Sequence, residues 1–223
     1  MQKPKTTSRK KPAQPEPANI IYDLAPIEEQ HNIIFKPNDG PQTEFLAASE
    51  REVLYGGSAG GGKSYAMLAD PLRFMGHPAF SGLLLRHTTE ELRELVFKSQ
   101  EMYPKIWPGI KWSERKMQWT APSGARLWMS YLDREDDALR YQGLAFSWIG
   151  FDELTQWPTP FAWNYMRSRL RSTASDLPVY MRATTNPGGR GHHWVKKMFI
   201  DPASTGKSFD ATDIETGEVL RYP

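Results

Sequence analysis

Hydrophobic residues in this chain gather in short runs that alternate with amphipathic stretches. The short apolar runs end in glycine, proline or polar residues and predict four β-strands: Val53–Tyr55, Gly82–Leu85, Phe146–Phe151 and Val179–Thr184. The stretches between and after them predict helices over Lys63–Met75, from Thr89 to about Met102, and over Pro160–Leu170 and His193–Ile200. In the second helix Leu92, Leu95 and Val96 share one face, and Pro104 and Pro108 are expected to end it.

Two further apolar runs, Met117–Thr120 and Ala125–Tyr131, are separated by a Pro-Ser-Gly sequence and predict a β-hairpin. Elsewhere strands and helices follow one another, which is typical of a parallel sheet covered by helices on both faces. We therefore expect an α/β fold with three αβα layers and a mostly parallel central sheet.

The first residues differ in composition from the rest of the chain. Residues 2–17 are basic and proline-rich and carry no large apolar side chain, so they cannot offset the entropy of ordering. We predict a disordered basic tail over residues 1–19 and a globular domain over residues 20–223. The tail is interpreted either as a solubilising leader or as an arm that tethers DNA.

Charge and composition exclude several classes of protein. The formal net charge is only +2, which argues against a histone-like basic protein, although local basic patches remain possible. The chain has no cysteine, which excludes disulfides, thiolate zinc sites and iron–sulfur clusters. No apolar run reaches the length of a membrane span, and no signal-peptide core is present, so we expect a soluble protein with no membrane partner.

A phosphate-binding loop is the most specific motif. Residues 57–64 fit the pattern G-x-x-x-x-G-K-[ST] between a predicted strand and a predicted helix: Gly57, Ser58, Ala59, Gly60, Gly61, Gly62, Lys63 and Ser64. Glycines let the backbone N–H groups converge on one anion, and the helix N-terminus adds partial positive charge. Lys63 can reach the β- and γ-phosphates, and the Ser64 hydroxyl can bind Mg²⁺. The motif predicts binding of a nucleotide, with Mg²⁺ as cofactor.

A pair of carboxylates follows the third predicted strand. Asp152 is placed to hold Mg²⁺, and Glu153 is placed to polarise an attacking water molecule. Asp152 lies 89 residues after Lys63, and the interval contains a further strand, as in ATPases that carry a catalytic glutamate on the Walker B strand. The pair therefore predicts hydrolysis and adds a catalytic-glutamate strand to the expected fold.

Two polar segments flank these motifs. Gln42 lies 15 residues before Gly57, and its amide can pair with the N6/N7 edge of adenine, which would favour ATP. A solvent-exposed glutamine in a turn is an equally good interpretation. Thr184, Thr185 and Asn186 follow the last predicted strand, where they could sense the γ-phosphate or simply form a turn.

These segments together resemble the ATPase part of tailed-phage large terminase subunits, the motors that package viral DNA. The resemblance covers roughly residues 40 to 205 and rests on GSAGGGKS, YQGLAFSWIGFDELTQW and ATTNPGGRGHHWVKKMFID. It implies an ATPase that moves double-stranded DNA into a procapsid. In residue terms, the resemblance makes Gln42 the adenine reader and residues 184–186 the motif that couples hydrolysis to movement.

The resemblance also implies partners and a location. A homo-oligomeric ring would stand on the portal protein, with double-stranded DNA in its channel and the small terminase subunit as a further partner, in the host cell cytoplasm. Large terminases carry a C-terminal RNase H-like nuclease domain, for which a chain ending at Pro223 leaves no room. We therefore expect a fragment or the product of a split gene, without nuclease activity.

Arginines and one acidic run offer further candidates. Many large terminases place an arginine before the glycine that leads into the Walker B strand, where this chain has Gln142. Arg140 is then the candidate arginine finger, with Arg86 and Arg190 as alternatives. The spacing of Arg167 and Arg171 suits either a DNA channel or an exposed helix face. The acidic run at residues 133–137 is interpreted as the solvated start of a helix rather than a two-metal nuclease site.

Three functions remain open at this point. The first is a packaging ATPase, the second a nucleotide-binding regulatory module without turnover, and the third another P-loop motor of the helicase or recombinase type. A binding-only module has no need of Glu153, and only the family-like segments distinguish the first function from the third.

Overall fold

The structure, a computed structural model, describes residues 34–222 apart from residues 59, 205 and 213–218. The predicted tail over residues 1–19 lies outside this range. The α- and 3₁₀-helices of the N-terminal half are α1 (Pro41–Ala47), α2 (Lys63–Ala69), η1 (Asp70–Phe74) and α3 (Thr89–Ile106). Those of the second half are η2 (Glu135–Tyr141), η3 (Leu154–Gln156), α4 (Phe161–Arg167), α5 (His192–Val195) and the π-helix η4 (Lys196–Ile200).

Seven strands form one sheet in the order β1-β7-β6-β2-β5-β4-β3. Their bounds are β1 (Glu52–Tyr55), β2 (Ser81–Arg86), β3 (Lys111–Ser113), β4 (Gln118–Thr120), β5 (Arg126–Tyr131), β6 (Trp148–Phe151) and β7 (Tyr180–Thr184). The first five in the sheet order pair in parallel, and β4 and β3 continue it antiparallel. A separate two-stranded sheet joins β8 (Phe209–Thr212) to β9 (Val219–Tyr222). The predicted mostly parallel α/β fold and the β4–β5 hairpin are confirmed.

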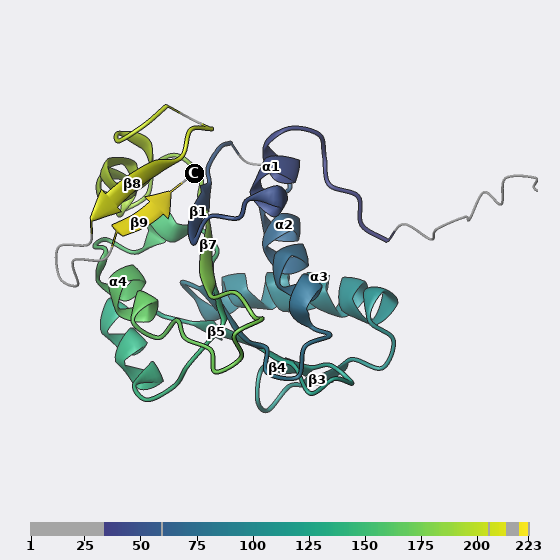
Figure 1. The fold of residues 1–223 in the computed structure, drawn as a ribbon. Helices are drawn as coiled ribbons and strands as arrows, with labels where there is room; N and C mark the ends of the chain where they lie inside the picture. The colour runs from purple at the N-terminus through teal and green to yellow at the C-terminus, as the bar shows by residue number, and fades with distance from the viewer. Residues whose placement is uncertain (1–33, 59, 205, 213–218, 223) are drawn as a thin grey trace, which may run out of the picture. The chain divides into compact units, whose positions relative to one another are not determined.

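The sheet separates two hydrophobic cores, because alternate residues of its strands face opposite ways. Leu84 of β2 and Trp148 of β6 belong to the core under α2 and α3. Their neighbours Leu83, Leu85 and Ile149 belong to the core under α4 and α5. Figure 1 shows α2 and α3 on one side of the sheet and α4 on the other. This arrangement is the expected three-layer αβα architecture.

The predicted helices differ from the structure at their ends. The helix predicted over Pro160–Leu170 ends at Arg167, the last helix continues from Lys196 as a π-helix, and two further differences occur at prolines. The helix after the phosphate loop changes from α to 3₁₀ at Asp70, because Pro71 has no N–H to continue the α-helical bonds. The prediction that Pro104 ends the next helix is wrong: α3 runs through Pro104 to Ile106. The loss of a single hydrogen bond near its C-terminus is tolerated, and Trp107 N still donates to the Tyr103 carbonyl at 2.8 Å.

Glycine is required where β6 passes under α2. A side chain at Gly150 would place its Cβ 2.7 Å from Met67 Sδ and 2.3 Å from the Trp148 ring. This close approach brings the helix that follows the phosphate loop directly onto the strand that precedes the two carboxylates.

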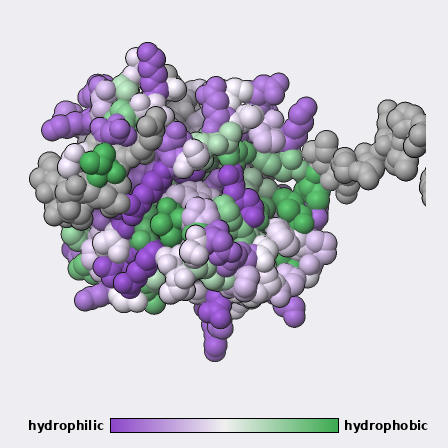
Figure 2. Space-filling model, in the orientation of Figure 1, coloured by the Kyte–Doolittle hydropathy of each residue, from purple (hydrophilic) through white to green (hydrophobic). Residues whose placement is uncertain are grey.

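Figure 2 shows hydrophilic residues over most of the visible face, with hydrophobic residues in separate small patches. Among the helices that the structure describes, none is long and apolar enough to cross a membrane.

Candidate nucleotide-hydrolysis site

The phosphate loop connects the end of β1 to the start of α2. Gly57, Gly60 and Gly62 have φ values of +132°, +87° and +73°, a region that favours glycine, so the loop can turn sharply. Lys63 is the first residue of α2 and is 6% exposed. Its Nζ donates to the carbonyls of Gly57 at 3.0 Å and Ser58 at 2.6 Å. Of the predicted loop residues, Ala59 lies outside the described part of the chain.

Gln42 and Tyr55 also contact this loop. Gln42 Nε2 donates to the Gly62 carbonyl at 2.8 Å, and its Oε1 accepts from Asn38 N at 2.6 Å. The Tyr55 hydroxyl donates to the Gly61 carbonyl at 2.6 Å. Gln42 is 2% exposed, so the interpretation as a solvent-exposed turn residue is wrong.

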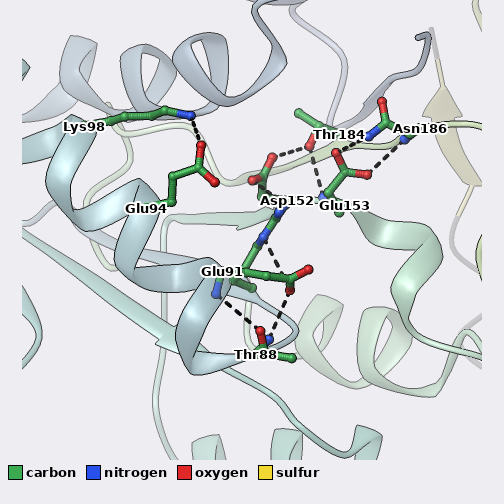
Figure 3. A network of polar contacts seen from close by, with 9 residues as sticks. Thr88, Glu91, Glu94, Lys98, Asp152, Glu153, Thr184 and Asn186 are labelled. Carbon is green, nitrogen blue, oxygen red and sulfur yellow. Dashed lines mark hydrogen bonds and ion pairs between the residues drawn. The ribbon is translucent and has the colours of Figure 1, made fainter. Parts of the chain in front are cut away.

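Asp152 follows the last residue of β6 and is almost completely buried. Its Oδ2 accepts from Arg86 Nη1 at 2.7 Å, and its Oδ1 accepts from the Thr184 hydroxyl at 2.5 Å (Figure 3). Burial raises the pKa of Asp152, while the Arg86 charge and the Thr184 hydrogen bond oppose this rise. The carboxylate is therefore held by one group from each of the two neighbouring strands.

Glu153 lies next to Asp152 with an unusual backbone conformation. Its φ of +62° and ψ of +56° belong to the left-handed region, which costs a non-glycine residue about 1–3 kcal/mol. Asn186 Nδ2 donates to Oε1 at 2.6 Å and Asn186 N to Oε2 at 3.1 Å, so one residue orients both carboxylate oxygens (Figure 3). Burial and the neighbouring Asp152 charge raise the pKa of Glu153.

The strand β7 brings the two halves of the site together. It lies between β1 and β6 in the sheet, although it follows both in the chain. The strands that lie between the phosphate loop and Asp152 in sequence are therefore not inserted between β1 and β6. The Thr184 hydroxyl donates to Asp152 and accepts from Glu153 N at 3.1 Å. Thr185 N donates to the carbonyl of Tyr55, where β1 ends, at 3.1 Å. The predicted coupling residues thus contact both the metal-binding and the catalytic candidates.

The donor set fits Mg²⁺. Ser64, the second residue of α2, and Asp152 offer a hydroxyl and a carboxylate, which are the hard oxygen ligands that Mg²⁺ takes. Mg²⁺ keeps several water or phosphate oxygens beside one or two protein ligands, so two are sufficient. The guanidinium on Asp152 indicates that a positive charge is stabilised at this buried carboxylate.

Arg140 lies in η2, and its side chain is 51% exposed. It donates to the carbonyls of Tyr131 at 2.8 Å and Asp137 at 3.2 Å, and no contact with the phosphate loop is found among the described residues. Arg190 is exposed and lines a pocket of about 380 Å³ with Arg134, Asp136 and Trp157. This pocket does not include the phosphate loop, so it is not the nucleotide site.

Two arginines have partners that sequence reasoning missed. Arg86 pairs with Asp152. The position of Arg86 at the end of β2, the strand next to β6, is the feature from which this pair could have been predicted. Arg167 is 10% exposed and binds both carboxylate oxygens of buried Glu52, at 2.5 and 3.0 Å. The interpretations of Arg167 as a channel residue or part of an exposed helix face are therefore wrong, and no short-range pattern links it to Glu52.

A protein-family model described as "Terminase large subunit, T4likevirus-type, N-terminal" matches residues 54–216. A comparison with curated proteins gives no match. The match includes the phosphate loop, both carboxylates and the coupling residues and covers most of the chain.

Solved structures give similar folds. A large terminase from a thermophilic bacteriophage is 19% identical with a TM-score of 0.59, over 74% of this chain and 43% of that one. The large terminase ATPase domain of Thermus phage P74-26 is 13% identical with a TM-score of 0.56, over 77% and 74%. The first of these terminases, in complex with ATP-γ-S, is 18% identical with a TM-score of 0.55, over 72% and 41%. The chain thus spans less than half of the thermophilic bacteriophage terminase.

Proposed function

The chain belongs to the T4-like-virus type of terminase large subunits, whose N-terminal part it matches, and on that premise we propose that it is the ATPase motor domain of a viral large terminase. In this proposal it hydrolyses ATP and couples hydrolysis to translocation of double-stranded DNA into a procapsid. The thermophilic bacteriophage terminase, which has the same fold, has been solved with ADP and with ATP-γ-S, and this supports ATP as the nucleotide.

One observation carries the proposal: Thr184 and Asn186, at the end of β7, bind the two carboxylates that follow β6, while Thr185 binds the end of β1. A nucleotide held by the phosphate loop would therefore have its γ-phosphate facing a metal ligand, a base and a polar sensor. A binding-only module would not need a carboxylate oriented through both oxygens.

Each residue has a role in this mechanism. Lys63 exchanges its bonds to the Gly57 and Ser58 carbonyls for the phosphates and offsets their charge. Ser64 and Asp152 would hold Mg²⁺, which would supply positive charge to offset that of the phosphates. Glu153 orients a water molecule and takes its proton at a carboxylate oxygen, and its raised pKa favours accepting that proton.

The coupling residues respond to the same event. When Glu153 accepts a proton, the hydrogen bond from Asn186 Nδ2 loses the charge that strengthens it. Thr184 and Thr185 lie in the same segment and connect this change to β1. In the proposed motor, this segment passes the state of the nucleotide to the parts that hold DNA.

The proposal extends to partners and place. The motor works as a homo-oligomeric ring on the portal protein in the host cytoplasm, with the small terminase subunit and double-stranded DNA as partners. Arg140 acts as the arginine finger on the nucleotide of a neighbouring subunit, because its half-exposed side chain lies at the surface and can exchange its bonds to the Tyr131 and Asp137 carbonyls for a phosphate across an interface.

Phosphate release by the purified chain tests the proposal. We expect slow hydrolysis of ATP that requires Mg²⁺ and increases on addition of procapsids and DNA. Lys63→Ala should abolish ATP binding in calorimetry, whereas Lys105→Ala, an exposed lysine of α3, should bind like the wild type. Wild-type affinity in Lys63→Ala would overturn the assignment of the nucleotide site.

A further inference from the structure

Three side chains hold the carbonyls of the phosphate loop. Gln42 Nε2 donates to the Gly62 carbonyl and the Tyr55 hydroxyl to the Gly61 carbonyl, while Lys63 Nζ binds the two carbonyls at the start of the loop. In a planar trans peptide, the C=O of one residue and the N–H of the next point in opposite directions. Fixing the carbonyls of Gly61 and Gly62 therefore fixes the N–H groups of Gly62 and Lys63, which are donors for an anion.

The amide of Gln42 is already engaged at both ends. Its Oε1 accepts from Asn38 N at 2.6 Å and its Nε2 donates at 2.8 Å to the loop, in a side chain that is 2% exposed. Pairing with the N6/N7 edge of adenine uses the same two atoms, one as acceptor and one as donor. Reading adenine would therefore require Gln42 to leave the loop.

The contact between Gln42 and the loop is close. Gly62 has a φ of +73°, and a Cβ there would lie 2.6 Å from Gln42 Nε2, so the two residues meet without space for a side chain. Phe45, one turn after Gln42 on the buried face of α1, packs on the Tyr55 ring with centroids 5.4 Å apart. Helix α1 thus supports the donors on both Gly61 and Gly62.

We propose that Gln42 is a positioning residue of the phosphate loop that acts on every ligand carrying phosphates, whatever its base. The inference rests on the proposed function, because it assumes that residues 57–64 bind phosphates. In this proposal α1 contributes to the affinity for the triphosphate, and this contribution is independent of selectivity for adenine.

Binding of three ligands tests the inference: ATP, GTP and inorganic tripolyphosphate, each titrated by calorimetry with Mg²⁺. Gln42→Met keeps the side-chain length and removes both hydrogen bonds. We expect all three affinities to fall together by about 5- to 10-fold, the size of the one lost hydrogen bond that reaches the loop, with the ATP-to-GTP ratio unchanged. Thr43→Val is the matched control, because it removes the neighbouring bond to the Asn38 carbonyl without touching the loop.

Two outcomes would overturn the inference. A collapse of the ATP-to-GTP ratio with unchanged tripolyphosphate affinity would make Gln42 an adenine reader, and three unchanged affinities would leave it without a role in the loop. Tyr55→Phe, which loses only the hydroxyl on Gly61, gives a second test with the same expected base-independent loss if Gln42→Met does not fold. Failure of the wild type to bind any of the three ligands would instead contradict the proposed function.

Discussion

Arg86 Nη1 lies 2.7 Å from Asp152 Oδ2, and this ion pair joins the ends of two neighbouring parallel strands. Arg86 is 13% and Asp152 1% exposed. A side chain so placed acts within its own subunit, which distinguishes Arg86 from a finger that reaches into a neighbour. Its positive charge lies at the carboxylate that is proposed to bind Mg²⁺.

Arg86→Gln should lower the free energy of unfolding by about 3 kcal/mol, because it leaves Asp152 buried without a counter-charge. The loss should shrink when Mg²⁺ and ADP are added together, but not with ADP and a chelator, since the cation supplies the missing charge. Urea denaturation measures both effects. Arg93→Gln, an exposed arginine of α3, should change stability by less than about 0.5 kcal/mol. A loss that does not depend on Mg²⁺ would contradict this account.

Glu153→Gln should keep nucleotide affinity while hydrolysis falls on the order of 10²-fold or more, because the amide cannot accept a proton from water. Calorimetry and phosphate release under single-turnover conditions separate the two quantities. Glu94→Gln alters an exposed carboxylate that pairs with Lys98, and this variant should hydrolyse normally. Normal hydrolysis by Glu153→Gln would place the base elsewhere.

Arg140→Ala should leave the nucleotide affinity of the isolated chain unchanged and reduce assembly-stimulated hydrolysis by about 10³-fold. The reason is that the contacts described for its guanidinium are with the Tyr131 and Asp137 carbonyls, the Tyr131 ring and the Asp137 carboxylate at 4.0 Å, and none of these belongs to the phosphate loop. Phosphate release measured against protein concentration tests this. Arg134→Ala, 77% exposed in the same segment, is the control. Fast hydrolysis that does not depend on concentration would exclude a finger acting in trans.

Breaking the Glu52–Arg167 ion pair should lower the stability of the fold. Arg167→Met is expected to lower the free energy of unfolding by about 3–5 kcal/mol, because Glu52 is 0% exposed and loses a bidentate partner. The double variant Glu52→Gln/Arg167→Met should recover part of the loss in chemical denaturation. Arg171→Met, an exposed residue four positions on, provides the comparison. Equal stability of the two single variants would argue against the pair.

The acidic run at residues 133–137 should not cleave DNA. Three of its four carboxylates have partners: Glu135 accepts from Thr159, Asp136 pairs with Arg134, and Asp137 caps the start of η2. Among the described residues, no group of three or more His, Asp or Glu side chains is arranged to hold a metal ion. The carboxylates of the run therefore do not converge on two ions as a two-metal nuclease requires. Plasmid incubated with the chain and Mg²⁺ or Mn²⁺ should remain supercoiled. Nicking that disappears in Asp136→Ala/Asp137→Ala would contradict this prediction.

The fold and the catalytic edge could be predicted because their signals are local. The phosphate loop is a continuous motif that depends on glycine φ values, and Asp152 and Thr184 stand at strand ends, which parallel pairing brings to one edge. The same argument could have placed Arg86 beside Asp152, since Arg86 also ends a strand. The order of the strands in the sheet could not be predicted from these local signals.

Other contacts could not be predicted because they depend on packing between distant segments. Glu52 and Arg167 are 115 residues apart in sequence and meet only because α4 covers the start of β1. The two sequence-based interpretations of Gln42 did not include a buried amide that binds the loop. Its burial depends on the packing of α1 against the loop, where Phe45 contacts Tyr55. The continuation of α3 through Pro104 also depends on packing, since Tyr103 is completely buried one residue earlier.

The left-handed backbone at Glu153 has a consequence for engineering. Asparagine adopts this conformation more readily than glutamate, so replacing Glu153 by asparagine would relieve local strain while removing the carboxylate. Directed evolution that screens only for heat resistance or expression yield would therefore favour loss of the very group proposed to activate water. A thermostable library of this protein needs a turnover screen alongside the folding screen, because fitness for stability and fitness for hydrolysis diverge at this residue.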